Sequence, residues 1–255
     1  MKISFQRRNG ASSPDVMFFW KMTIDAKQSD VITDLFIPEL FFDYSLVKTG
    51  GVQCVDEARG WKFTPFKQAL KTIHARPLRL FFFTPLVLYG VRLSLSFAES
   101  FRDELNANSF LEQAWVRDDI EDLDSFKMEV EEHLHRRGRK KHPYPMFSSG
   151  LKESAWLVHF SPRHKRRLYR ETFGLSRREL LNIQNVQSFL EQTCDFASEN
   201  PRIIRHVDPE VFYDQPHLNR TFRKLIGISP LEYFETNSIL QDNLMSASYN
   251  VNQGQ

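Results

Sequence analysis

The chain has 255 residues, 41% of them hydrophobic, which is enough for two domains with a sizeable core. Its formal net charge of +2 conceals an asymmetry: residues 1–132 carry 16 basic and 20 acidic side chains (net −4), whereas residues 133–255 carry 18 and 12 (net +6). There are two cysteines, no signal-peptide core, and an apolar run at residues 81–91 only about half as long as a spanning helix, so we predict a cytoplasmic protein with no membrane partner.

The first half of the chain has the pattern of a β-rich domain. Residues 1–95 contain short runs of Phe, Val, Leu and Ile that Pro, Gly and Asp interrupt, which is typical of strands. These runs are Met17–Ile24, Val31–Val47, Gly51–Val55 and Leu78–Leu95. From Ser96 the apolar spacing becomes helical, at Phe97, Phe101 and Leu105 and again over Leu123–His135. We predict a barrel or sandwich with two or three helices over residues 1–135.

Aromatic residues of this half have two interpretations: they line a pocket for a small effector, or they fill the hydrophobic core, which is the commoner role. They are Trp20, Phe41, Trp61, Phe63 and Phe82. The sequence contains no glycine-rich phosphate loop, no HExxH motif and no nucleophile elbow, so it predicts no enzyme, no cofactor and no metal site. Cys194 is predicted to be a buried structural thiol, and His133, His135 and His142 are predicted to be solvated.

A basic segment follows the first half. Residues 136–146 are predicted to be an interdomain linker, because six residues from Arg136 to Lys141 include five basic ones and His142-Pro-Tyr-Pro145 comes directly after them. Between His133 and Arg178 there are 13 basic and 2 acidic residues, a net charge of +11. The linker arginines and lysines either contact phosphates or are merely solvated.

The sequence then contains a 20-residue repeat: residues 161–180 align without a gap with residues 214–233, 53 positions later. Six matched pairs are His164/His217, Arg167/Arg220, Arg170/Arg223, Gly174/Gly227, Ser176/Ser229 and Glu179/Glu232. Each copy predicts a helix with an N-cap residue (Ser161, Asp214), a glycine stop, and a Ser–Glu capping box that begins the next helix.

Helical spacing separates two faces in each copy. In the first copy Arg163, Arg166, Arg167 and Arg170 share one face, and Lys165, Leu168, Tyr169 and Thr172 share the other. In the second copy Leu218, Phe222, Leu225 and Ile226 face inward, whereas Pro216, His217, Arg220 and Arg223 face outward, with Asn219 at the margin and Gln215 near the tip. Arginine can bind guanine edges, and Asn or Gln can bind adenine. One such face is usually only solvated, but two equivalent faces favour nucleic-acid binding.

The segment between the copies predicts a long helix, roughly Arg177–Ala197, with an apolar stripe at steps of three and four. About 20 residues span about 30 Å, close to the spacing of about 34 Å between successive major-groove faces of B-DNA. The two basic helices could therefore enter consecutive turns of one groove, which favours duplex DNA.

Residues 147–236 resemble the DNA-binding region of AraC-family transcription regulators, in which a linker helix joins two helix-turn-helix units. The stretch from Tyr213 to Tyr233 carries most of the resemblance, and Ser161 to Ser176 is a looser match. Residues Trp20, Ile37–Asp43 and Leu88–Leu93 also lie at places that correspond to the β-rich half of some AraC-type regulators.

The resemblance implies a bacterial regulator with double-stranded DNA as its partner. It places the base-reading residues at Arg163, Arg166, Arg167, Gln215, His217, Asn219 and Arg220, and phosphate contacts at Arg170 and Arg223. RNA polymerase and a small-molecule effector are further partners that it leaves open, as is the choice between monomer and homodimer. The predicted fold class is α+β, with the β-rich domain over residues 1–135, the linker over 136–146, an all-α double helix-turn-helix over 147–240 and a disordered tail over 241–255.

The chain also departs from the family pattern. Lys165 occupies an inward position that the family fills with an apolar residue, and His159 and Val211 stand where turn glycines are expected. Asp208-Pro209-Glu210 predicts a cap that interrupts the helix before the second turn. The alternative function is therefore a protein-interaction adaptor whose helix-turn-helix units no longer bind DNA.

Overall fold

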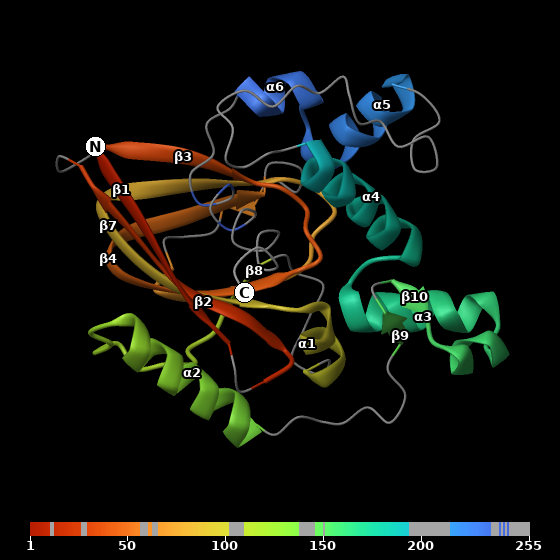
Figure 1. Ribbon diagram of the computed structural model, residues 1–255, viewed down its shortest axis with the longest axis horizontal. Coiled ribbons are helices and arrows are strands. Elements are labelled where there is room, and N and C mark those ends of the chain that lie inside the picture. The colour runs from red at the N-terminus through yellow and green to blue at the C-terminus, as the bar shows by residue number, and fades with distance from the viewer. Residues whose placement is uncertain are drawn as a thin grey trace.

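The computed structural model describes residues 1–10, 13–26, 30–56, 61–62, 66–101, 110–137, 146–149, 151–193, 215–235, 240, 242 and 244. A large antiparallel sheet occupies one side of the molecule, and most of the helices lie on the other side (Figure 1). The α+β class is therefore as predicted. No helix among the described residues is both long and apolar enough to cross a bilayer.

The described residues of the N-terminal half form eight strands and two helices. The elements are β1 (Lys2–Asn9), β2 (Val16–Asp25), β3 (Val31–Phe36), β4 (Phe42–Asp56), β5 (Trp61–Lys62), β6 (Gln68–Lys71), β7 (Leu78–Leu93), α1 (Leu95–Ser100), β8 (Phe110–Glu112) and α2 (Leu123–Arg137). The strands confirm the runs predicted from sequence, except that the run from Val31 to Val47 is divided at Pro38 into β3 and β4.

The sheet is ordered β1-β2-β7-β4-β6-β8, with β3 also paired to β7 and β5 to β4, and every pairing is antiparallel. The register of β4 against β7 shifts between Val47 and Thr49 and again before Gly51. Gly50 adopts φ +79°, and a Cβ there would lie 2.4 Å from the carbonyl oxygens of Phe83 and Pro85. Bulges of this kind bend a strand, which allows the sheet to curl around its contents.

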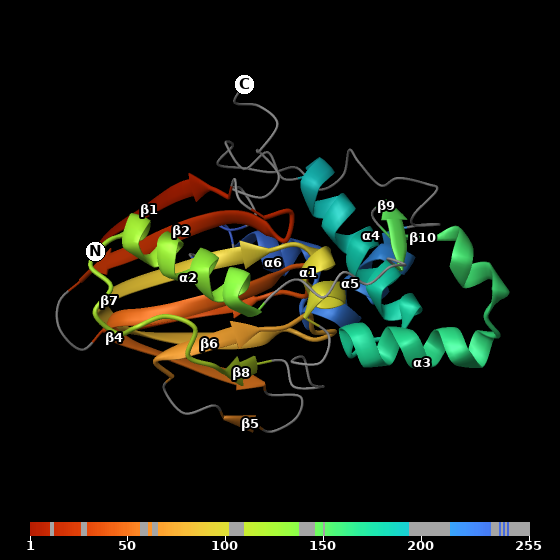
Figure 2. The ribbon, with the colours of Figure 1, turned by 90° about the horizontal axis from the view of Figure 1, so that it is seen from below.

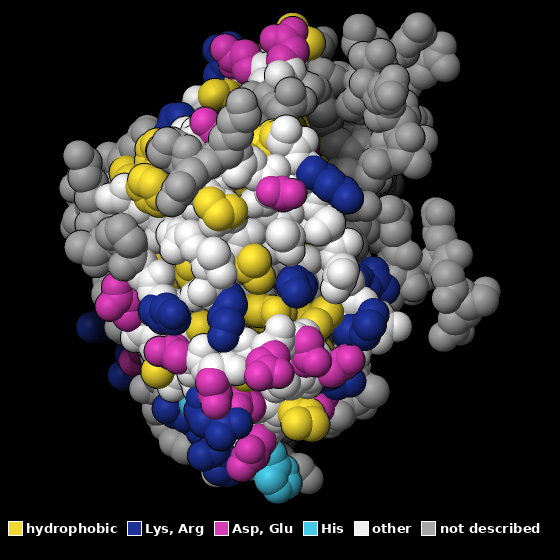
Figure 3. Space-filling model, turned by 90° about the vertical axis from the view of Figure 1, so that its left-hand side faces the viewer, with side chains coloured by type: hydrophobic (Ala, Val, Ile, Leu, Met, Phe, Trp, Pro, Cys, Tyr) yellow, Lys and Arg dark blue, Asp and Glu magenta, His cyan; other side chains and the backbone are white. Residues whose placement is uncertain are grey.

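Alternate residues of the strands face two different cores, as the two-residue period of a strand requires. Phe19 belongs to the first core, together with Tyr44 and Tyr89, whereas Phe18 and Trp20 belong to the second. Helix α2 covers the first core, where Phe126 packs with its ring centroid 5.7 Å from that of Tyr89 (Figure 2). On the face that includes this helix, seen in Figure 3, acidic and basic side chains are interspersed.

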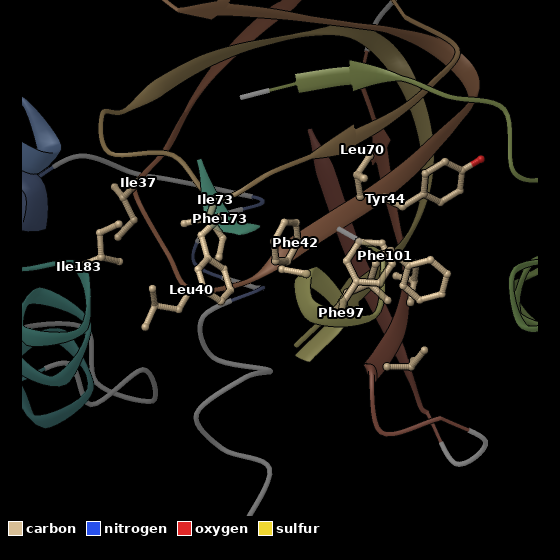
Figure 4. Packing of buried hydrophobic residues seen from close by; sticks show 14 of the residues in the cluster. Ile37, Leu40, Phe42, Tyr44, Leu70, Ile73, Phe97, Phe101, Phe173 and Ile183 are labelled. Carbon is tan, nitrogen blue, oxygen red and sulfur yellow. The ribbon is translucent and has the colours of Figure 1, made fainter. Parts of the chain in front are cut away.

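The first core extends across the predicted boundary between the two halves, residues 136–146. Ile37 and Leu40, which lie between β3 and β4, belong to the same cluster of buried residues as Phe173 and Ile183 from the helical half (Figure 4). The β-rich and helical halves therefore share one hydrophobic core. Most of the predicted linker, residues 138–145, lies outside the described residues.

Two residues of the predicted tail, Asp242 and Leu244, are described, and the rest of residues 241–255 lie outside the described residues. Leu244 is 0% exposed and Leu240 is 2% exposed, and both belong to the core cluster that contains Trp20 and Phe82. The prediction of a disordered tail followed its Asn, Ser and Gln composition, whereas these two leucines are four residues apart and share one helical face.

A buried group of charges stands at one end of the β-rich half. Arg92 on β7 donates from Nη2 to Glu39 Oε2 (2.7 Å) and from Nε to Asp43 Oδ1 (2.8 Å), and Lys71 Nζ lies 2.8 Å from Asp43 Oδ2. Burial by itself raises the pKa of Asp43, but attraction to Arg92 and Lys71 outweighs burial and lowers it to about 2. Burial and the charge of Lys71 lower the pKa of His74 to about 3, so this imidazole is neutral. The charges of the two carboxylates, Glu39 and Asp43, are therefore balanced by those of Arg92 and Lys71.

Candidate nucleic-acid interface

The helical half begins differently from the prediction. A two-stranded antiparallel sheet, β9 (Phe147–Ser149) and β10 (Lys152–Glu153), is followed by a short 3₁₀ helix, η3 (Ala155–His159). The prediction of an all-α region from residue 147 is therefore wrong at its start. His159, which stands where a turn glycine was expected, is the last residue of η3, and Phe160 after it has extended backbone (φ −93°, ψ 142°).

The first of the two helices predicted to read DNA (the reading helices), α3 (Pro162–Phe173), has the boundaries that its caps predict. The Ser161 side chain accepts a hydrogen bond from the backbone N–H of His164, and Pro162 occupies the first turn, where its missing N–H costs nothing. Gly174 ends the helix with φ 71°, and its N–H donates to the carbonyl of Arg170 (3.0 Å). These local predictions are confirmed.

Helix α3 has one buried face and one cationic face. Tyr169, Thr172 and Phe173 are buried against the core. The exposed arginines, which we call the α3 arginine face, are Arg163, Arg166, Arg167 and Arg170. The structure therefore presents to solvent all four arginines of α3 that the sequence analysis assigned to DNA.

Two of these arginines are held by neighbours on the same helix. Arg167 Nη2 lies 3.2 Å from His164 Nδ1, and its Nε lies 3.7 Å from Glu171 Oε1. Arg166 Nε donates to the carbonyl of Pro162 (3.3 Å). Because these contacts are exposed and weak, the side chains can exchange them for contacts with a nucleic acid at little cost.

Glu153 on β10 is the residue that the sequence analysis missed. Its carboxylate accepts hydrogen bonds from Lys165 Nζ (3.0 Å) and Tyr169 OH (2.9 Å), and it lies 3.2 Å from Arg177 Nε. Burial by itself raises the pKa of Glu153, but the hydrogen bonds from Lys165 and Tyr169 outweigh burial and lower it. The sequence signal for this carboxylate was Lys165, because an inward lysine without an acidic neighbour on its own helix needs an anionic partner from another element.

The helix after α3 is α4 (Arg177–Thr193), which begins at the predicted capping box. Ser176 N–H donates to Glu179 Oε2 (2.7 Å), and Glu179 N–H donates to Ser176 Oγ (3.3 Å). Its buried residues include the predicted stripe of Leu180, Ile183, Val186 and Leu190. At 1.5 Å per residue, its 17 residues span about 25 Å. Residues 194–197 of the predicted helix, Cys194 among them, lie outside the described residues.

The second reading helix, α5 (Gln215–Ile226), repeats the two faces of α3. Its buried residues are Leu218, Phe222, Leu225 and Ile226, as predicted. Its exposed residues include Pro216, His217, Arg220 and Arg223, and Asn219 is half-buried. Gln215 is helical, but its side chain lies outside the described residues, as do Asp208, Pro209, Val211 and Asp214.

A glycine and a capping box again follow the second helix. Gly227 has φ 85°, and α6 (Pro230–Glu235) begins where Ser229 N–H donates to Glu232 Oε2 (2.6 Å). Helix α4 lies between the two reading helices, and its Phe189 packs edge to face on Phe222 of α5 (6.1 Å between ring centroids). In Figure 1, α3 runs horizontally whereas α5 is inclined to it. The two helices are therefore not parallel in this conformation.

The aromatic residues proposed for an effector pocket are divided. Trp20 and Phe82 are fully buried in the second core, and Phe41 is half-buried with the Arg92 guanidinium 4.8 Å from its ring centroid. The side chains of Trp61 and Phe63 lie outside the described residues. His133 is not simply solvated as predicted, since its ring stacks on Trp115 (5.0 Å between centroids).

Comparison with known proteins gives matches among solved structures alone. No family model matches the sequence, and no curated protein matches it. The apo form of a ToxT point variant from Vibrio cholerae strain SCE256 is 14% identical over 90% of this chain and 99% of that chain, with a TM-score of 0.48. Wild-type ToxT from the same strain with bound unsaturated fatty acid is 12% identical over 90% and 97%, with a TM-score of 0.44. KdgF from Halomonas sp. matches 35% of this chain and 79% of its own, at 15% identity and a TM-score of 0.25.

Proposed function

We propose that this chain is a sequence-specific DNA-binding regulator of transcription, as its resemblance to the AraC family implies. The observation that carries the proposal is the α3 arginine face, in which four arginines are exposed while the opposite face of the same helix is buried. An α-helix fits the major groove, and a guanidinium can donate two hydrogen bonds to the O6 and N7 acceptors of guanine. The site residues are those that the resemblance named on α3 and α5.

The charge distribution supports the same function. Thirteen basic and two acidic residues between His133 and Arg178 attract a polyanion, and this attraction is expected to weaken steeply with salt. On α5, Arg220 and His217 are exposed at the positions that match Arg167 and His164. The repetition of the same outward residues on two helices is what a ligand with repeated grooves requires.

The β9–β10 hairpin favours the adaptor as the second candidate function. A helix-turn-helix unit uses its first helix to cross the DNA backbone, and here a hairpin and a 3₁₀ helix precede α3. An adaptor uses the same exposed residues to bind a protein partner and has no affinity for DNA. The two functions differ in whether low salt retains the chain on random-sequence duplex.

The deciding experiment selects bound fragments from a random DNA pool and then measures affinity for the selected site. We expect Arg167→Ala to cost about 1–3 kcal/mol on that site and to relax base preference at one position. Arg8→Ala is the matched control, because Arg8 is an exposed arginine (57% for its side chain) on β1 of the β-rich half. Equal losses on selected and random DNA would make Arg167 a phosphate contact, and no retention at low salt would favour the adaptor.

A further inference from the structure

The end of the described chain lies inside the β-rich half. Leu240, Asp242 and Leu244, which we call the strap, are helical, and the two leucines are 2% and 0% exposed. Both pack in the second core with residues such as Phe36 and Leu80. Because they are four residues apart, their side chains leave the same face of one helical turn. A short apolar segment from the helical half thus completes the core of the other half.

Polar contacts hold the strap at both ends. The backbone N–H of Leu240 donates to Oδ2 of Asp34 on β3 (2.6 Å), and Asp34 is only 5% exposed. The acceptor of this hydrogen bond therefore lies 206 positions away in the sequence. At the other end, the carbonyl of Leu244 lies 3.5 Å from Nη1 of the buried Arg92. The β-rich half therefore offers the strap both a buried acceptor and a buried donor.

The strap limits the movement of the second reading unit. Helix α6 ends at Glu235, five positions before Leu240, and a fully extended chain of that length reaches about 17 Å. Tyr233 of α6 packs against Phe222 of α5 (5.7 Å between ring centroids), so the two helices move together. Gly227, directly after α5, also lies near the β-rich half, since a Cβ built on it would be 3.5 Å from Pro77 Cγ.

The docked strap and its short tether restrict α5 and α6 to an orientation that does not suit a straight duplex. Two helices that enter successive turns of one major groove must present their outer faces in parallel, and α5 is inclined to α3 (Figure 1). Resting on the proposed DNA-binding function, we propose that the strap is an autoinhibitory latch: docked in the second core, it holds α5 and α6 so that the second reading helix cannot follow α3 into the groove. Release of the strap frees the second unit.

A disulfide that holds the strap in its docked position tests the latch. The double variant Asp34→Cys/Leu240→Cys places thiols at two residues that are in contact, since Asp34 Oδ2 lies 2.6 Å from the Leu240 backbone N. A disulfide forms there if the two Cα atoms come within about 4–7 Å of each other. The double variant also carries Cys194→Ser, so that its only other thiol is the buried Cys54. We expect oxidation to weaken binding to the selected two-unit site about tenfold relative to the reduced protein, because the fraction of molecules with a free second unit falls. Binding to a site trimmed to the α3 half should not change.

A released strap gives the opposite result. Leu240→Ala/Leu244→Ala is expected to bind the two-unit site about tenfold more tightly than the wild type. Hydrogen exchange should speed up in α6 while the amides of β2 and β7 stay protected, which shows that the sheet remains folded. The matched control is Leu231→Ala, since Leu231 lies on α6 and is 62% exposed.

Each outcome decides one of the two proposals. Equal affinity of the oxidised and reduced lock overturns the latch, and it does so even if the alanine variant fails to fold. In that case a loss of affinity in Arg167→Ala would still support DNA binding. If no version is retained on DNA, the proposed function fails, and the inhibitory role of the strap fails with it.

Discussion

Replacement of Glu153 by glutamine tests how the first reading unit is held together. The carboxylate contacts Lys165, Tyr169 and Arg177, so it ties β10 to both α3 and α4. The Glu153 side chain is 22% exposed, so its burial is intermediate between that of a surface ion pair and that of a buried one. A surface pair contributes about 0–1 kcal/mol, and disruption of a buried pair costs about 3–5 kcal/mol. We expect Glu153→Gln to lower the free energy of unfolding by about 2 kcal/mol and the Tm by roughly 4–8 °C.

The assay is thermal and urea unfolding of the variant beside two comparisons. Glu171→Gln is the matched control, because Glu171 is 44% exposed and its contact with Arg167 is 3.7 Å long, so the change should stay within about 0.5 kcal/mol. Lys165→Met leaves Glu153 with two partners and puts an apolar side chain on the inner face of α3, so we expect a loss below about 1 kcal/mol. A Glu153→Gln protein as stable as the Glu171→Gln control would refute the reasoning.

The same carboxylate gives a pH dependence with a definite sign. The pKa of Glu153 is lowered in the folded state, so its stabilising effect is present above its unfolded pKa of about 4.3 and is lost as the pH falls through the folded value. The difference in stability between the wild type and Glu153→Gln should therefore be full at pH 7 and shrink below about pH 4. A constant difference down to pH 3 would contradict this assignment.

Two further predictions concern the β-rich half. The pKa of Asp43 is lowered to about 2, below its unfolded value of about 3.9, so this carboxylate should stabilise the fold by about 2–3 kcal/mol at neutral pH. That contribution is lost as the pH falls from about 4 through 2, and Asp43→Asn should flatten the acid limb of a stability-versus-pH curve; an unchanged limb would exclude Asp43 as its source. A Cβ on Gly90 would lie 2.1 Å from the buried Trp20 ring, so Gly90→Ala should cost about 1–3 kcal/mol by urea unfolding. Gly51→Ala, with its nearest contact at 3.3 Å on the Phe83 side chain, is the milder comparison and should cost less.

Local chemistry explains what could be predicted from the sequence. The ends of α3 depend on Ser161, Pro162 and Gly174, which act through the backbone within three or four residues of themselves. The α3 arginine face could be predicted from the helical period alone, because the apolar residues on the opposite side of the helix must face the core. Such features require no knowledge of the rest of the fold.

Features that depend on distant partners were not predictable in the same way. Strands β9 and β10 have three and two residues, too few for a two-residue period to be recognised. The strap pairs with Asp34 across 206 positions, and no local pattern in the sequence indicates that partner. The order of the sheet is likewise set by tertiary contacts, since β7 pairs with β2, β3 and β4 at once.

Lys165 shows why the hairpin is compatible with the DNA contacts proposed for α3. The inner face of that helix needs a cover that can accept a cation, and β10 supplies it through Glu153, whereas an apolar helix would leave the ammonium group unpaired. With the inner face satisfied, the four arginines on the outer face remain exposed. If α3 binds DNA, the hairpin takes the place of the helix that would cross the DNA backbone, and we propose that the basic residues 136–141 supply phosphate contacts instead. On this reasoning, neutralising Arg136 and Arg137 should reduce the salt dependence of DNA binding without changing base preference, whereas changes on α3 should alter the preference itself.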